Sequence, residues 1–156
     1  MIDKILISAC FLRKRVRYDG KIISLEHPLI VQWYDEGRLV TICPEMEGGL
    51  PVPRAPAEIN PNTGKVITIE QVDVTSEFTR GASKALALCV KLNIRFAILK
   101  ESSPSCGSHM IYDGSFSGKK ISGEGLTAKL LRQHGVNVVS EKNLSLLVNL
   151  LDDDKT

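Results

Sequence analysis

The chain has 156 residues, of which 43% are hydrophobic and 24% charged, and its formal net charge is +2. These values are typical of one folded domain, and so small a net charge does not indicate a surface dedicated to nucleic acid. Apolar runs stay well short of the ~20 residues of a membrane span, and the first residues lack the pattern of a secretion signal. We therefore expect a cytoplasmic, single-domain protein over residues 1–156, with a flexible acidic tail at 152–156.

Four short apolar runs have the composition of buried parallel strands. Each is rich in Ile, Leu or Val and is bounded by polar or glycine-containing segments, as central strands of a parallel sheet are. They cover residues 4–9, 38–42, 95–99 and 136–139.

Helical patterns lie between these runs. Pro28 suits the first turn of one helix, and Asp73 or Thr75 can cap another. We expect helices at 27–37, 73–93, 125–135 and 144–151. The alternation predicts an α/β fold, with one mainly parallel sheet flanked by helices and joined by right-handed crossovers.

Two segments depart from this alternation. Residues 48–71 are rich in proline and then carry N-P-N-T-G before a β-branched run at 66–69, which predicts an ordered excursion with a small hairpin. Residues 109–125 carry four glycines, from which we expect a long loop that folds over a site as a lid.

Three of the four cysteines follow predicted strands. Cys10 and Cys43 come directly after the first and second strands, and Cys106 lies a few residues beyond the third. Because parallel sheets bind ligands at the carboxyl ends of their strands, we expect these thiols to converge there. Cys89 lies on the apolar stripe of the 73–93 helix, where a cysteine packs as a small hydrophobe.

Three convergent thiolates have several uses, and spacing alone does not choose among them. They can bind zinc with His109 or water as fourth ligand, form a redox pair with a spare despite the lack of C-x-x-C, or hold an iron–sulfur cluster. They can also be buried small residues that share one edge by coincidence. The pattern predicts a three-thiolate site with an open position.

Polar residues beside the cysteines are candidates for catalysis or binding. Glu45 follows Cys43 closely and is either a general acid or base or a surface carboxylate. Hydroxyls near Cys106 can bind an oxygen or an anion, and the candidates are Ser102, Ser103 and Ser105. Tyr18 and Asp19 either line the crevice expected at the carboxyl ends of the strands or only form a turn. The basic residues of 13–17 are either solvated or contact an anionic group.

Eight motifs spread along the chain carry a resemblance to a known family. They are I-S-A-C at 7–10, V-R-Y-D-G at 16–20, H-P-L-I at 27–30, C-P-E at 43–45, G-G-L-P-V-P-R at 48–54, S-P-S-C-G-S at 103–108, Y-D-G-S-F-S-G at 112–118 and G-E-G-L-T-A at 123–128. Together they resemble the thiouracil desulfidases, over about residues 5–141.

The resemblance implies a [4Fe–4S] cluster whose three protein ligands are Cys10, Cys43 and Cys106. The iron without a protein ligand would bind the sulfur of a thiolated uracil. Water would attack the carbon, and the sulfur would remain on the cluster before leaving as hydrosulfide, without net redox chemistry. Glu45 would be the general base or acid, and a nearby serine would assist it, for which Ser103 is favoured over Ser102 because it occupies the motif position.

The position of four residues near the predicted site makes them candidates for substrate contacts, and these are Ser102, Ser105, Tyr18 and Asp19. The substrate would be a thiolated pyrimidine as base, nucleoside or nucleotide, and thiolated RNA fragments stay open. A nucleotide phosphate would meet Arg54 or the basic residues of 13–17.

Two other functions compete with this one. A zinc-dependent hydrolase could use the same three thiolates, although the deaminase pattern of H-x-E with P-C-x-x-C is absent. A non-catalytic module could hold a structural cluster or carry sulfur to a partner.

Overall fold

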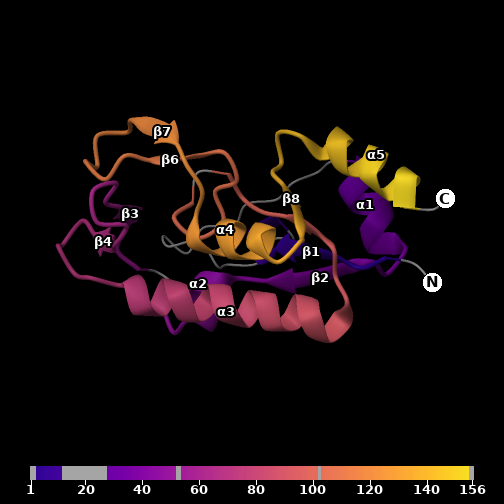
Figure 1. The fold of residues 1–156 in the computed structure, drawn as a ribbon, viewed down its shortest axis with the longest axis horizontal. Coiled ribbons are helices and arrows are strands. Elements are labelled where there is room, and N and C mark those ends of the chain that lie inside the picture. Colours follow the sequence, from indigo (N-terminus) through magenta and orange to yellow (C-terminus); the bar gives the residue numbers. More distant parts are fainter. Residues whose placement is uncertain (1–2, 12–27, 52–53, 102, 155–156) are drawn as a thin grey trace.

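The computed structural model describes residues 3–11, 28–51, 54–101 and 103–154, without the side chains of residue 10 and residues 152–154. Its central sheet has four parallel strands in the order β2-β1-β5-β8. These strands are β1 (Ile5–Ser8), β2 (Leu39–Ile42), β5 (Phe96–Ile98) and β8 (Asn137–Val139). All four lie within the predicted runs, so the predicted α/β fold with a mainly parallel sheet is confirmed (Figure 1).

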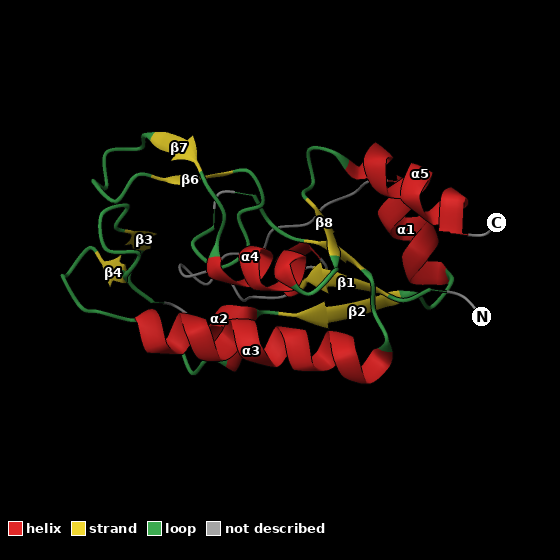
Figure 2. Cartoon of the chain, in the orientation of Figure 1, coloured by secondary structure: helices red, strands yellow, loops and turns green. Residues whose placement is uncertain are grey.

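Both faces of the sheet are covered by helices. Consecutive residues of a strand point to opposite faces, so these largely apolar strands place hydrophobic side chains on both. On one face, Ile5 and Ile7 of β1 pack with Trp33 of α1 (Pro28–Asp35) and Leu147 of α5 (Leu144–Asp154). Figures 1 and 2 show α1 and α5 lying together at one end of the molecule.

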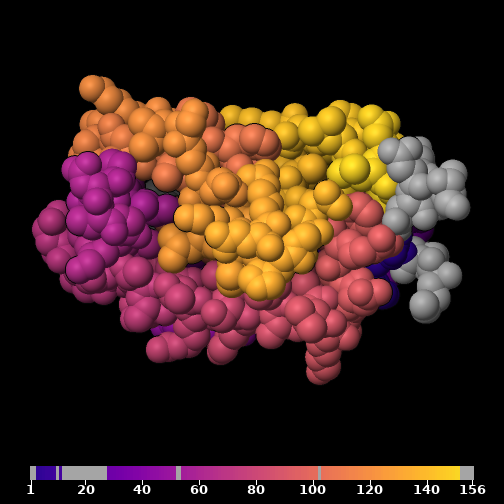
Figure 3. All heavy atoms as spheres, viewed as in Figure 1, coloured from indigo at the N-terminus to yellow at the C-terminus, as the bar shows by residue number. Residues whose placement is uncertain are grey.

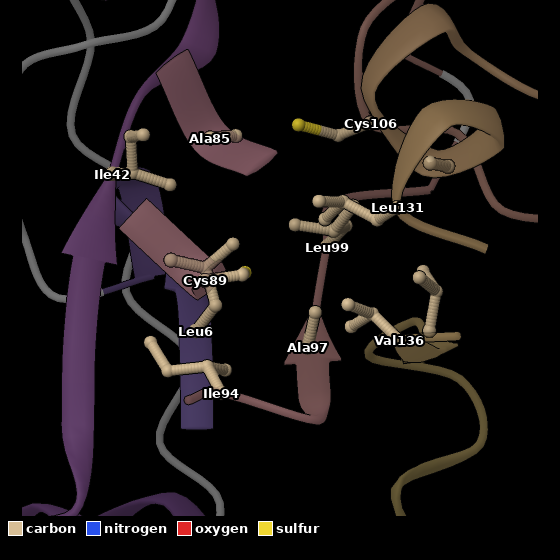
Figure 4. Close-up of a cluster of buried hydrophobic side chains, with 12 residues drawn as sticks. Leu6, Ile42, Ala85, Cys89, Ile94, Ala97, Leu99, Cys106, Leu131 and Val136 are labelled. Carbon is tan, nitrogen blue, oxygen red and sulfur yellow. The ribbon is translucent and has the colours of Figure 1, made fainter. Parts of the chain in front are cut away.

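The other face carries the second part of the core. Leu6 of β1 packs there with Cys89 of α3 (Thr75–Leu92) and Leu131 of α4 (Leu126–Gln133). Figure 4 shows this cluster, with Cys106 beyond Leu99 and its sulfur pointing away from α4. Cys89 is 2% exposed, which confirms the prediction that it belongs to the core.

The helices begin and end close to the predicted positions. Asp73 does not cap α3 directly; its Oδ1 accepts the Thr75 N–H at 2.9 Å, and the N-cap residue is Val74. Helix α5 continues to Asp154, beyond the predicted end at residue 151. Within the described residues, no helix is both long and apolar enough to cross a bilayer.

Two antiparallel hairpins extend from the end of the molecule opposite α1 and α5 (Figures 1 and 3). The first, β3 (Ala57–Ile59) with β4 (Val66–Thr68), confirms the predicted hairpin in the 48–71 excursion. The second, β6 (Met110–Tyr112) with β7 (Lys120–Ser122), shows that the prediction of one long loop at 109–125 was wrong. Ile111 explains the difference, because it is buried among residues of both hairpins and α3 and holds β6 in place.

Candidate active site

A cavity of about 620 Å³ lies at the carboxyl ends of β1 and β2. Strand pairing sets Ser8 opposite Ile42, so the residues that follow β1 and β2 leave the sheet at the same level. The wall facing the sheet is formed by the hairpins, with Glu58, Thr68 and Tyr112 among its residues. The expectation of a site at this edge of the sheet therefore matches the place where the cavity is found.

Cys43 and Cys106 both line this cavity. Cys43 follows β2 and is the N-cap residue of α2 (Pro44–Glu47), with extended backbone angles of φ −116 and ψ 100. Burial raises the pKa of the Cys43 thiol, and the nearby Glu45 carboxylate raises it further. A bound metal ion or a nearby positive charge would have to lower this pKa again, since only the thiolate is a good ligand.

The third predicted ligand is only partly described. Cys10 lies in the short 3-10 helix Ala9–Phe11, directly after β1 and thus at the same sheet edge as Cys43. Its side chain is outside the described part of the chain, so the convergence of all three thiols stays a prediction. Among the described side chains, no three His, Cys, Asp or Glu residues form a group that could hold a metal ion.

Glu45 is held in a fixed orientation on α2 by two partners. The Arg54 Nε donates to its Oε2 at 2.9 Å, and the Arg54 Nη2 contacts the same oxygen. The Ser103 hydroxyl donates to Oε1 at 3.1 Å. The Arg54 and Glu45 side chains are 8% and 16% exposed, so this is a largely buried ion pair, which is costly to break.

The contacts of Glu45 can be compared with the roles predicted from the sequence. Glu45 and Ser103, predicted as the catalytic pair, do lie together at the cavity. Arg54, considered there as a phosphate contact, instead directs its guanidinium to Glu45. The sequence offered no signal for that pairing beyond the motif in which Arg54 occurs.

Ser103 also organises the backbone that carries Cys106. Its Oγ accepts the N–H groups of Ser105 at 3.1 Å and Cys106 at 3.2 Å. The Ser103 hydroxyl therefore links the Glu45 carboxylate to the turn that contains Cys106.

Glu101, which was not among the residues predicted from the sequence, fixes the backbone that follows Cys106, at residues 108–110. Its Oε1 accepts three consecutive backbone N–H groups, from Ser108 at 2.9 Å, His109 at 3.0 Å and Met110 at 3.1 Å. Its Oε2 accepts the Ser108 hydroxyl at 2.8 Å. A run of N–H groups around one carboxylate oxygen is an anion-binding nest, and here the anion belongs to the loop itself.

The remaining candidates lie away from the cavity or outside the described chain. Ser105 is fully buried, and its hydroxyl is 2.6 Å from the Thr127 hydroxyl on α4. The His109 Nδ1 is 2.8 Å from the Ser108 hydroxyl, and neither Ser105 nor His109 lines the cavity. Tyr18, Asp19, Ser102 and the basic residues of 13–17 are outside the described residues, so their predicted roles stay predictions.

Comparison with known proteins agrees with the motifs. The family model described as 2-thiouracil desulfurase matches residues 5–143. An uncharacterized protein, YbbK of Bacillus subtilis (strain 168), is 45% identical in an alignment of 149 positions that covers 90% of this chain and 97% of the relative.

A solved structure is also similar along almost its whole length. It is the [4Fe-4S]-dependent thiouracil desulfidase TudS, with a TM-score of 0.93 and 49% sequence identity over 96% of this chain and 98% of that one. The chain therefore belongs to the 2-thiouracil desulfurase family.

Proposed function

We propose that this chain is a [4Fe–4S]-dependent desulfidase that converts a thiolated uracil and water into uracil and hydrosulfide. The observation that carries the proposal is one cavity whose wall includes Cys43, Cys106 and a Glu45 held by Arg54 and Ser103. The similar TudS structure is that of a [4Fe-4S]-dependent thiouracil desulfidase.

The donor set at the cavity fits such a cluster. Cysteine sulfur is the preferred protein ligand of iron in these clusters, and two of the three proposed ligands, Cys43 and Cys106, line the cavity. The third is Cys10, which follows β1 at the same sheet edge. When bound, a cluster with three protein ligands supplies an iron with an open position, which is a Lewis acid for the soft thiocarbonyl sulfur.

The chain's own residues supply the proton transfer. Arg54 occupies Oε2 of Glu45, so Oε1 is the oxygen that accepts a proton from an attacking water. As Oε1 takes that proton, the water oxygen bonds to the ring carbon and the second electron pair of the carbon–sulfur double bond moves to sulfur. The carbonyl then forms as the hydroxyl loses its remaining proton to solvent and the carbon–sulfur single bond breaks. Glu45 returns its proton to the sulfur, which leaves as hydrosulfide. Ser103 keeps Oε1 pointed into the site through its 3.1 Å hydrogen bond, which is the positioning that general base catalysis requires.

The cavity suits a small pyrimidine and has room for more. Its volume of about 620 Å³ lies within the range of roughly 300–1,000 Å³ that is usual for small-molecule sites. Lys100, Lys120 and Lys142 are part of its wall and can attract an anionic group. The proposed substrates are therefore a thiolated uracil as base, nucleoside or nucleotide, in a cytoplasmic setting that keeps thiols reduced.

Anaerobic turnover of 4-thiouracil in ¹⁸O-labelled water tests the proposal. We expect hydrosulfide release with one ¹⁸O in each uracil formed. Glu45→Gln should lower the rate about 10²-fold or more without loss of iron. Glu47→Gln is the matched control, because Glu47 is an exposed carboxylate on the same short helix. Sulfide release without ¹⁸O uptake, or a protein that binds zinc and no iron, would contradict the proposal.

A further inference from the structure

Ser8 stands out among the residues at the cavity because its hydroxyl contacts a proposed cluster ligand. It is the last residue of β1, an interior strand of the sheet, and is 3% exposed. Its Oγ donates a hydrogen bond to the Cys106 Sγ at 3.6 Å. None of the functional roles described above uses this residue.

A second hydrogen bond leaves the Ser8 proton available for the sulfur. The Lys100 N–H donates to the Ser8 Oγ at 3.1 Å, so the hydroxyl accepts on one side and keeps its single proton to donate. A thiolate sulfur that binds iron has no proton of its own, so Ser8 must be the donor in that state. The contact is built by two strands, since Ser8 ends β1 and Lys100 follows β5.

We propose that Ser8 is a positioning residue that holds the Cys106 sulfur through its hydroxyl proton and lowers the electron density on that sulfur when it binds iron. The inference rests on the proposed function, in which Cys106 is a cluster ligand. Hydrogen bonds to the sulfurs are among the features that set the reduction potential of an iron–sulfur cluster. Removal of this bond should leave the sulfur more electron-rich and shift the potential to a more negative value.

A purely structural role for Ser8 is the competing explanation, because its oxygen also accepts the partly buried Lys100 N–H. The chain provides a matched control for this at Ser140, which follows β8 and is fully buried. The Ser140 Oγ accepts the Lys142 N–H at 3.1 Å and donates to the Asn143 Oδ1 at 3.1 Å. Both serines accept one backbone N–H and donate one proton, but only Ser8 donates to sulfur.

The test is an anaerobic potentiometric titration of the reconstituted cluster in the wild type, Ser8→Ala, Ser8→Thr and Ser140→Ala. We expect a more negative midpoint potential in Ser8→Ala, a potential near that of the wild type in Ser8→Thr, and no shift in Ser140→Ala. An unshifted potential in Ser8→Ala, or an equal shift in Ser140→Ala, would overturn the inference.

A second measurement covers the case in which Ser8→Ala assembles no cluster. The iron–cysteine sulfur stretching bands of the wild-type protein should shift when H₂O is replaced by D₂O, because the Ser8 proton exchanges. Bands that do not move would overturn the inference even though the cluster is present. A wild-type chain that takes up no iron would instead overturn the proposed function, and the inference with it, so the two failures are distinguishable.

Discussion

Gly81 of α3 controls how closely the Cys43–Glu45 turn approaches the rest of the molecule. A Cβ added at Gly81 would lie 1.8 Å from the Pro44 carbonyl oxygen and 2.6 Å from its carbon. The reverse contact is equally tight, because a Cβ at Gly48 would lie 1.9 Å from the Glu77 carbonyl oxygen. Helices α2 and α3 therefore touch backbone to backbone at two glycines (Figure 2).

Gly81→Ala should force these helices apart. Real Cβ atoms essentially never approach within 3.0 Å of another heavy atom in such contacts, so α2 must move by roughly 1 Å in a close-packed region. Overpacking of this kind costs about 1–3 kcal/mol, whereas replacing glycine by alanine inside a helix otherwise gains about 1 kcal/mol. We therefore expect the usual gain to be lost and the free energy of unfolding to fall by up to about 2 kcal/mol.

The same displacement should reduce activity, because α2 carries Glu45 and follows Cys43. A misplacement of about 1 Å can cost ~10²-fold in rate. The assays are urea unfolding and sulfide release, with Ser83→Ala as control, since Ser83 is an exposed residue of the same helix. If Gly81→Ala is as stable and as active as Ser83→Ala, the account of how α3 positions the site is refuted.

Three other changes should have distinct effects. Arg54→Lys should lower the rate of sulfide release about tenfold or more at unchanged iron content, because lysine lacks the forked donors that hold Glu45; an unchanged rate would contradict this. Burial raises the pKa of Cys89 to about 11 from 9.0, so the unfolded thiol ionises first and stability falls as pH rises from 9 towards 11. Cys89→Ala should flatten that slope in chemical unfolding at each pH, and an equal slope would refute it. Glu101→Ala should lower the free energy of unfolding by ~2 kcal/mol or more, since it removes the acceptor of one buried and two partly buried backbone N–H groups. A loss below about 1 kcal/mol in urea unfolding would contradict this role of Glu101.

The sheet and its helices could be predicted from the sequence because their signals are local. The strands are continuous apolar runs, and α3 keeps its apolar residues at helical spacing over 18 residues. Helix α2 has only four residues, which is too short for a periodic pattern. The glycines of 109–125 indicated a loop, but the burial of Ile111 fixes strand β6 through contacts distant in sequence.

The site was predictable only in part for the same reason. Cys43 and Cys106 could be placed at the sheet edge because each follows a recognisable strand. The pairing of Glu45 with Arg54 could not be predicted, since Arg54 reaches it across a proline-rich segment without periodicity. Glu101 carries no motif at all, and its role depends on a turn that brings the N–H groups of residues 108–110 to one oxygen.

The central proposal is that Cys10, Cys43 and Cys106 hold a catalytic iron–sulfur cluster, two of them from the wall of this cavity. Its most direct test is the iron content per chain after anaerobic reconstitution with iron and sulfide, in the wild type, Cys106→Ala and Cys89→Ala. The account predicts about four irons in the wild type, the same in Cys89→Ala, because Cys89 is a core residue, and loss of the cluster in Cys106→Ala. Full iron content in Cys106→Ala, or loss of iron only in Cys89→Ala, would contradict it.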